Sequence, residues 1–76
     1  MQEEIEKILN LDIPSTSKLI LIYIKLKGEG CVSQNELASK ISCSPSGLIK
    51  CSKKLEELGY LEVDRNYRQN YYKVLI

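Results

Sequence analysis

The sequence predicts a single, mainly helical α+β domain that ends in a β-hairpin, and three observations lead to this fold class. The chain has 76 residues, which is enough for one hydrophobic core and too few for a second. Up to about residue 58, apolar residues recur at the three- and four-residue spacing of helices. After residue 60 they alternate with polar residues, as in half-buried strands.

The composition is that of a globular protein. Hydrophobic residues make up 43% of the chain and charged residues 28%, a balance that is typical of neither disordered nor membrane proteins. The longest apolar stretch, residues 19–24, is far shorter than the roughly 20 residues that cross a bilayer. The N-terminus lacks the basic and apolar regions of a signal peptide. We therefore expect a cytoplasmic protein with no membrane partner.

The first predicted element is an amphipathic helix over residues 2–11. Ile5, Ile8 and Leu9 lie along it at helical spacing, and acidic residues occupy its first turn, where the helix dipole favours them. Pro14 interrupts the pattern, because proline disfavours helix in the residue before it. The apolar side of this helix either pairs with a second copy of the chain, as a dimer element, or covers the core of its own domain.

Charge divides the chain into residues 1–12 and a larger domain over residues 13–76. The first part holds four acidic residues and one lysine, a net charge of −3, whereas the second holds ten basic and six acidic residues, a net charge of +4. Two stretches of the second part, residues 43–55 and 65–76, carry three basic residues each and no acid. Such stretches in a chain of net charge +1 indicate a basic patch, a feature of proteins that bind nucleic acids.

A second, central helix is expected to begin near Ser15 or Ser17, one of which caps it, and to end at about Lys27. Apolar residues over 19–26 surround almost the whole helix, which predicts that it is buried. A strand is the competing interpretation of this run, which is rich in β-branched residues. The two glycines at 28–30 favour a helix end.

Two further helices are separated by a short polar break at residues 42–44. Ser33 and Glu36 form the pattern of a capping box, in which each side chain binds the backbone N–H of the other residue, and they open the first of these helices. Ser44 caps the second helix, with Pro45 at its first position, where a missing N–H costs nothing. The apolar positions expected to pack these helices are Leu37, Ala38, Ile41, Cys43, Leu48, Cys51, Leu55 and Leu58.

The last part of the sequence predicts a β-hairpin. Gly59 ends the preceding helix, and residues 60–64 and 71–76 alternate between apolar and polar side chains on either side of a polar turn at residues 65–70. Residues 31–32 could add a short strand. Two helices joined by a short break and followed by a hairpin make a winged helix-turn-helix, here with a three-helix core, a hairpin wing and an extra short N-terminal helix.

The sequence also resembles a known family. Residues 33–38 (SQNELA), 53–61 (KKLEELGYL) and 70–72 (NYY) look like segments of prokaryotic winged helix-turn-helix domains. The resemblance covers about residues 13–76 and is closest to the domains of plasmid and phage replication proteins and of small transcriptional regulators. It implies sequence-specific binding of double-stranded DNA, in transcription regulation or as a replication or transfer accessory protein. Ser42 departs from the pattern, because helix-turn-helix units often have glycine in this turn.

In such a domain the helix over about residues 45–58 enters the major groove, and the wing over about residues 65–70 contacts the DNA beside it. Lys50 is the best candidate for a guanine contact. The N–H groups of Ser33 and Gln34 open a helix and could hold a phosphate. The residues expected to bind DNA are Ser33, Gln34, Ser44, Ser46, Gly47, Ile49, Lys50, Lys53, Lys54, Arg65, Asn66, Tyr67, Arg68, Gln69 and Asn70.

The sequence has no pattern for a catalytic, metal or cofactor site. It contains no histidine, and Cys31, Cys43 and Cys51 are too widely spaced for a zinc site. We expect the three thiols to be reduced and buried. We also expect that the protein is not an enzyme and binds neither a cofactor nor a small-molecule ligand.

The sequence leaves two alternatives to DNA binding. A winged helix that serves as a protein–protein interaction scaffold would show an acidic or mixed recognition helix. A thiol- or metal-responsive regulator would need an exposed cysteine. If the chain does bind DNA, one module binds weakly, so we expect a homodimer on half-sites about 10 base pairs apart.

Overall fold

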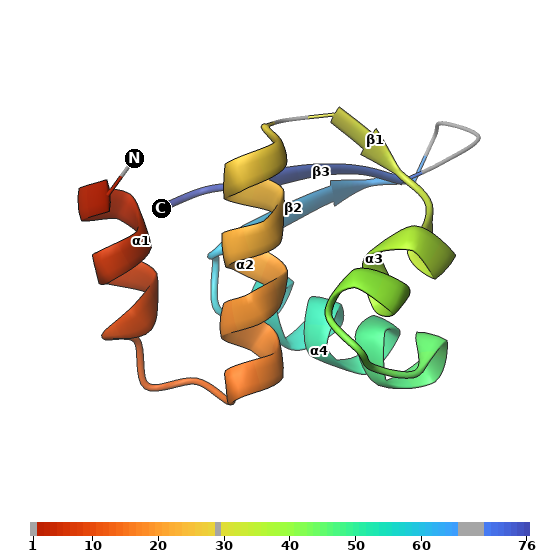
Figure 1. The fold of residues 1–76 in the computed structure, drawn as a ribbon, viewed down its shortest axis with the longest axis horizontal. Coiled ribbons are helices and arrows are strands. Elements are labelled where there is room, and N and C mark those ends of the chain that lie inside the picture. The colour runs from red at the N-terminus through yellow and green to blue at the C-terminus, as the bar shows by residue number, and fades with distance from the viewer. Residues whose placement is uncertain (1, 29, 66–69) are drawn as a thin grey trace.

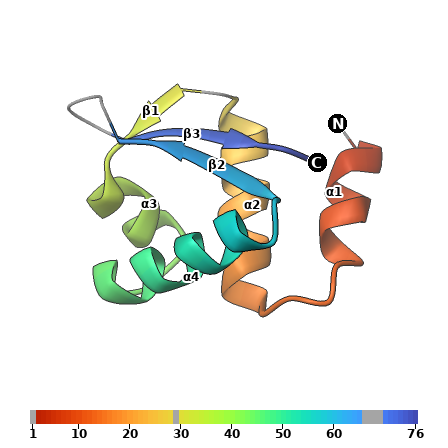
Figure 2. The ribbon, with the colours of Figure 1, turned by 180° about the vertical axis from the view of Figure 1, so that it is seen from behind.

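Four helices and a three-stranded antiparallel sheet make up the part of the chain that the structure describes, residues 2–28, 30–65 and 70–76. The structure is a computed structural model. Figures 1 and 2 show α3 and α4 on one side of α2 and α1 on the other. The elements are α1 (Gln2–Leu9), α2 (Ser15–Lys27), β1 (Gly30–Val32), α3 (Gln34–Lys40), α4 (Pro45–Glu57), β2 (Leu61–Asp64) and β3 (Asn70–Val74).

This architecture confirms the predicted fold class. Three helices and a hairpin form a winged helix-turn-helix, with α1 as the extra N-terminal helix. Its core lies where α2, α3, α4 and the sheet meet. The buried apolar residues are Ile8, Ile20, Leu21, Ile24, Val32, Leu37, Ala38, Ile41, Leu48, Leu55, Leu61, Tyr72 and Val74.

Helix α2 is central, as predicted, but it is less buried than its apolar sequence suggests. Ile20 and Leu21 are fully buried, whereas Leu19 and Leu26 are 46% and 63% exposed. The prediction of a buried helix is therefore only partly right. The elements that pack on α2 leave part of its surface uncovered: α1 contacts it at Lys18 and α3 contacts it at Tyr23, whereas no element in the described part of the chain covers Leu26.

The start of α2 also differs from the prediction. Pro14 occupies the N-cap position, and its carbonyl oxygen accepts a hydrogen bond from the N–H of Lys18 at 3.1 Å. Ser15 is the first helical residue and Ser17 is buried, so neither caps the helix. Proline suits this place because its ring holds φ, here −59°, while its carbonyl still accepts the first helical hydrogen bond.

Helix α1 packs on α2 through one side. Ile8 is 1% exposed and belongs to the core. The ammonium of Lys18 donates to the carbonyl oxygen of Leu9 at 2.7 Å, and Lys25 pairs with Glu4 at 3.8 Å. This side of α1 therefore covers the core of its own domain, while the side chain of Leu9 is 52% exposed.

Strand β3 is the middle strand of the sheet, in the order β1-β3-β2. It pairs with β2 to form the hairpin, with Leu61 opposite Val74 and Val63 opposite Tyr72. It also pairs with β1, where Val32 lies opposite Asn70. The expected short strand at residues 31–32 is thus part of the sheet and ties the segment before α3 to the hairpin.

The turn between α3 and α4 contains a residue in the left-handed region. Ser42 has a φ of 58°, a conformation that costs an L-residue roughly 1–2 kcal/mol. The turn is closed by the N–H of Cys43, which donates to the carbonyl oxygen of Ala38 at 2.9 Å. Ser42 is the position at which the sequence departs from the glycine of related turns, and the backbone shows why glycine suits it.

We expect the substitution Ser42→Gly to raise the free energy of unfolding by about 0.5–1 kcal/mol. Glycine removes the cost of the left-handed conformation. Its larger conformational entropy in the unfolded chain cancels part of this gain in stability. Urea denaturation followed by circular dichroism measures the change. Ser39→Gly, at an exposed position within α3, is the matched control and should lower stability by about 0.5 kcal/mol. Equal losses in both variants would contradict strain at Ser42.

Candidate nucleic-acid interface

The outer side of α4 carries basic side chains. Lys50, Lys53 and Lys54 are exposed, as is Ser46 in the first turn, and Ile49 is 37% exposed. No acidic residue occurs in α4 before its last two positions. The lysines that the sequence assigns to DNA binding therefore lie on the surface, along a helix that is positively charged over most of its length.

The N-terminus of α4 is built as predicted. The hydroxyl oxygen of Ser44 accepts a hydrogen bond from the N–H of Gly47 at 3.1 Å and lies 3.4 Å from the hydroxyl of Ser46. A Cβ atom at Gly47 would lie only 3.1 Å from the oxygen of Ser44. Glycine at this position thus leaves the cap undisturbed, and Pro45 opens the helix without a missing hydrogen bond.

Predicted site residues from three elements converge on one small cavity of about 70 Å³. Gln34 from α3, Ile49 and Lys53 from α4, and Arg65 and Asn70 from the hairpin all line it. The cavity therefore marks the junction of the helix-turn-helix with the wing. Ser44, Ser46 and Gly47 do not line this cavity, and they form the start of α4 instead.

Ser52 lines the same cavity and is not among the predicted site residues. It is only 4% exposed, and its hydroxyl has no hydrogen-bond partner among the described residues. Cys51 and Leu58 were predicted to lie on the buried side of α4, but Cys51 is half-buried and Leu58 is 44% exposed. The buried side is formed by positions 48, 52 and 55, so Ser52 takes the place of Cys51 in the predicted set. A serine gives no hydrophobic signal from which the burial of position 52 could have been predicted.

The two described residues of the predicted wing turn already have partners within the chain. Both terminal nitrogens of Arg65 donate to the carboxylate of Glu56 in α4, at 3.1 and 3.0 Å, and this contact raises the pKa of Arg65. The amide of Asn70 donates to the hydroxyl of Tyr72 at 3.2 Å. The other predicted wing residues, Asn66, Tyr67, Arg68 and Gln69, lie outside the described residues.

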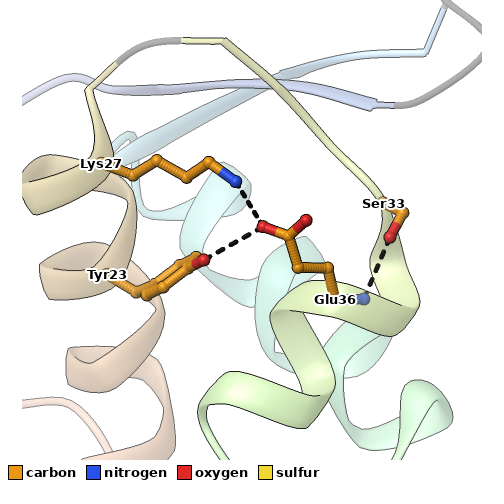
Figure 3. Close-up of polar contacts among 4 residues, drawn as sticks. All are labelled: Tyr23, Lys27, Ser33 and Glu36. Atoms are coloured by element: carbon orange, nitrogen blue, oxygen red, sulfur yellow. Dashed lines mark hydrogen bonds and ion pairs between the residues drawn. The ribbon is translucent and has the colours of Figure 1, made fainter.

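The N-terminus of α3 is held against α2 by polar contacts (Figure 3). The hydroxyl of Ser33 accepts from the N–H of Glu36 at 3.0 Å, which is one half of the predicted capping box. The carboxylate of Glu36 does not complete the box. It accepts from the hydroxyl of Tyr23 at 3.0 Å and pairs with Lys27, so that both of these α2 side chains point at α3. Hydrogen bonding from Lys27 and Tyr23 lowers the pKa of Glu36, and hydrogen bonding to Glu36 raises the pKa of Lys27.

The cysteine prediction is only partly right. Cys43 and Cys51 are free thiols, as expected, but both are half-buried rather than fully buried. Cys51 opens onto a groove of about 410 Å³ between α4 and the start of α2, where Pro14 and Ser17 also lie. Among the described residues, no group of three or more histidine, cysteine or acidic side chains is placed to hold a metal ion. No helix in the described part of the chain is long and apolar enough to cross a bilayer.

Comparison with known proteins supports the fold. No family model and no curated protein sequence matches the chain. Among solved structures, a MarR family protein from Bacillus stearothermophilus superposes on 97% of this chain with a TM-score of 0.71 and 19% sequence identity. This chain corresponds to 52% of that protein, so it spans about half its length. The similarity supports the winged helix-turn-helix and gives no support to the replication-protein kind of this fold.

We expect Glu36→Gln to lower the melting temperature at pH 7 and to have a smaller effect at pH 3. The folded state lowers the pKa of Glu36, so its contribution is complete above the ordinary glutamate pKa, about 4, and is lost as the pH falls through the lowered value. Lys27, whose pKa is raised, keeps its charge until the pH exceeds about 10. Thermal melts of both proteins at pH 3 and pH 7 test this, and an equal difference at both values would contradict an ionic role.

Proposed function

We propose that this chain binds double-stranded DNA, with the N-terminal half of α4 in the major groove and the hairpin beside it. The observation that carries the proposal is the outer side of α4, where Lys50, Lys53 and Lys54 are exposed on a helix that has no acid before Glu56. Phosphate neutralisation by such side chains supplies most of the affinity of a DNA-binding protein. An α-helix fits the major groove, which presents a different pattern of donors and acceptors for each base pair.

We infer the role of each exposed residue of α4 from its position along the helix. Lys50 lies in the second turn and is exposed, within reach of base edges, where its ammonium suits the O6 and N7 atoms of guanine. Ile49, 37% exposed on the side toward the hairpin, suits the methyl group of thymine. Lys53 and Lys54 are one turn further along, where phosphates are the nearer partners. In this arrangement Ser46 and the capped start of α4 also face the major groove of the DNA.

The process in which the chain acts is proposed on a different basis. Similarity to a MarR family structure favours a transcriptional regulator over a replication or transfer protein. A protein-interaction scaffold is disfavoured because the outer side of α4 is basic rather than acidic or mixed. A homodimer remains part of the proposal, and the exposed apolar side chains of Leu9, Leu19 and Leu26 offer it a surface.

Binding of a random-sequence duplex at several salt concentrations tests the proposal. We expect log K to fall against log[salt] with a slope of about −4, as four or five phosphates are neutralised. Lys53→Ala should weaken binding of every sequence and make the slope shallower by about 1. Fluorescence anisotropy of labelled DNA measures both quantities. Lys7→Ala is the matched control, because Lys7 is exposed on α1, on the far side of α2 from α4. No binding at low salt would reject the proposal in favour of a scaffold.

Lys50→Ala tests base recognition separately. Once a preferred site has been selected from a random library, this variant should bind that site about 1–3 kcal/mol more weakly, because a base contact is lost. Its affinity for random duplex should fall much less. Parallel titrations with the selected and the random duplex measure the difference. Equal losses on both would show that Lys50 contacts phosphate only.

A further inference from the structure

Glu56 holds the side chain of Arg65, the basic residue at the base of the wing, in an ion pair. Its carboxylate accepts two hydrogen bonds from the guanidinium of Arg65, at 3.1 and 3.0 Å. Each carboxylate oxygen accepts from a different terminal nitrogen, so the ion pair is bidentate. The side chain of Glu56 is 27% exposed and that of Arg65 is 50% exposed. Arg65 follows β2 directly, whereas Glu56 lies in the last turn of α4. The contact therefore joins the proposed recognition helix to the proposed wing.

A phosphate group can replace this carboxylate. The two parallel N–H donors of arginine match carboxylate and phosphate oxygens in the same planar geometry. An exposed ion pair is also weak, so that a competing anion displaces one partner at little cost. Lys53 lines the same junction cavity as Arg65, and an incoming phosphate would meet two positive charges there instead of one.

We infer that Glu56 occupies the phosphate-binding position of Arg65 in the free protein, and that a DNA backbone phosphate replaces the carboxylate on binding. This inference rests on the proposed function and adds a regulatory residue to it. Glu56 orients the guanidinium toward α4 before DNA arrives, but it lowers affinity because the ion pair must open. Because the phosphate that replaces the carboxylate is part of every DNA sequence, the ion pair weakens binding to all sequences alike. It leaves base contacts at the start of α4 unchanged.

The test compares the variants Glu56→Gln and Glu57→Gln on random-sequence duplex by fluorescence anisotropy. Both substitutions remove one negative charge from the last turn of α4, but Glu57 is exposed and is not the hydrogen-bonding partner of Arg65. We expect Glu56→Gln to bind about threefold to fivefold more tightly than Glu57→Gln, the factor that corresponds to opening one exposed ion pair. Arg65→Ala should bind more weakly than wild type, with a salt slope shallower by about 1.

The advantage of Glu56→Gln should vanish when Arg65 is replaced by alanine in both variants. If the ion pair were a strut that persists in the complex, Glu56→Gln and Arg65→Ala would both weaken binding, and the inference would be overturned. It would also be overturned if Glu56→Gln bound no more tightly than Glu57→Gln, or kept its advantage without Arg65. In each of these cases wild type still binds DNA and the proposed function stands. Failure of wild type to bind at low salt would overturn both.

Discussion

The arrangement of the whole molecule depends on the burial of one side of α4. Leu48 and Leu55 are both fully buried, two helical turns apart, so the helix cannot rotate without exposing one of them. The same constraint turns Lys50 outward and Lys53 toward the hairpin. Which residues of α4 are free to meet a partner is therefore decided by packing in the core rather than by the charges themselves.

The surface around α4 has two electrostatic characters. On the side toward the hairpin, polar side chains already have partners within the chain, because Arg65 pairs with Glu56 and the amide of Asn70 donates to Tyr72. On the outer side and at the opposite edge, Lys50 and Lys54 border a groove in which Glu57 is the acidic residue, and Lys53 lines both this groove and the cavity beside the hairpin. In the proposed complex, a polyanion would therefore meet positive charge first along α4, and the hairpin would contribute after its own contacts had rearranged.

Local signals explain how much of the fold was predictable. Pro45 and Gly59 mark the ends of α4 through backbone chemistry alone, and the alternating residues of the hairpin mark both strands. The buried positions Leu48 and Leu55 of α4 were predicted correctly, whereas the burial of Ser52 was missed, because it depends on contacts with other elements that a one-dimensional pattern does not contain. The ion pair between Glu56 and Arg65 was missed for the same reason. Its partners meet only after β2 folds back along α4, and the assignment of Arg65 to DNA remains a prediction.

The strand order carries a consequence for how the domain assembles. The last strand in the sequence is the middle strand of the sheet, so β1 and β2 have no strand partner until β3 joins them. Pairings between residues 30–32 and 70–72 close a long segment of chain, and such non-local contacts form late because loop closure is costly. A growing polypeptide could form the helices first, but neither the sheet nor the anchoring of α3 to the hairpin would exist before residue 74 had been added.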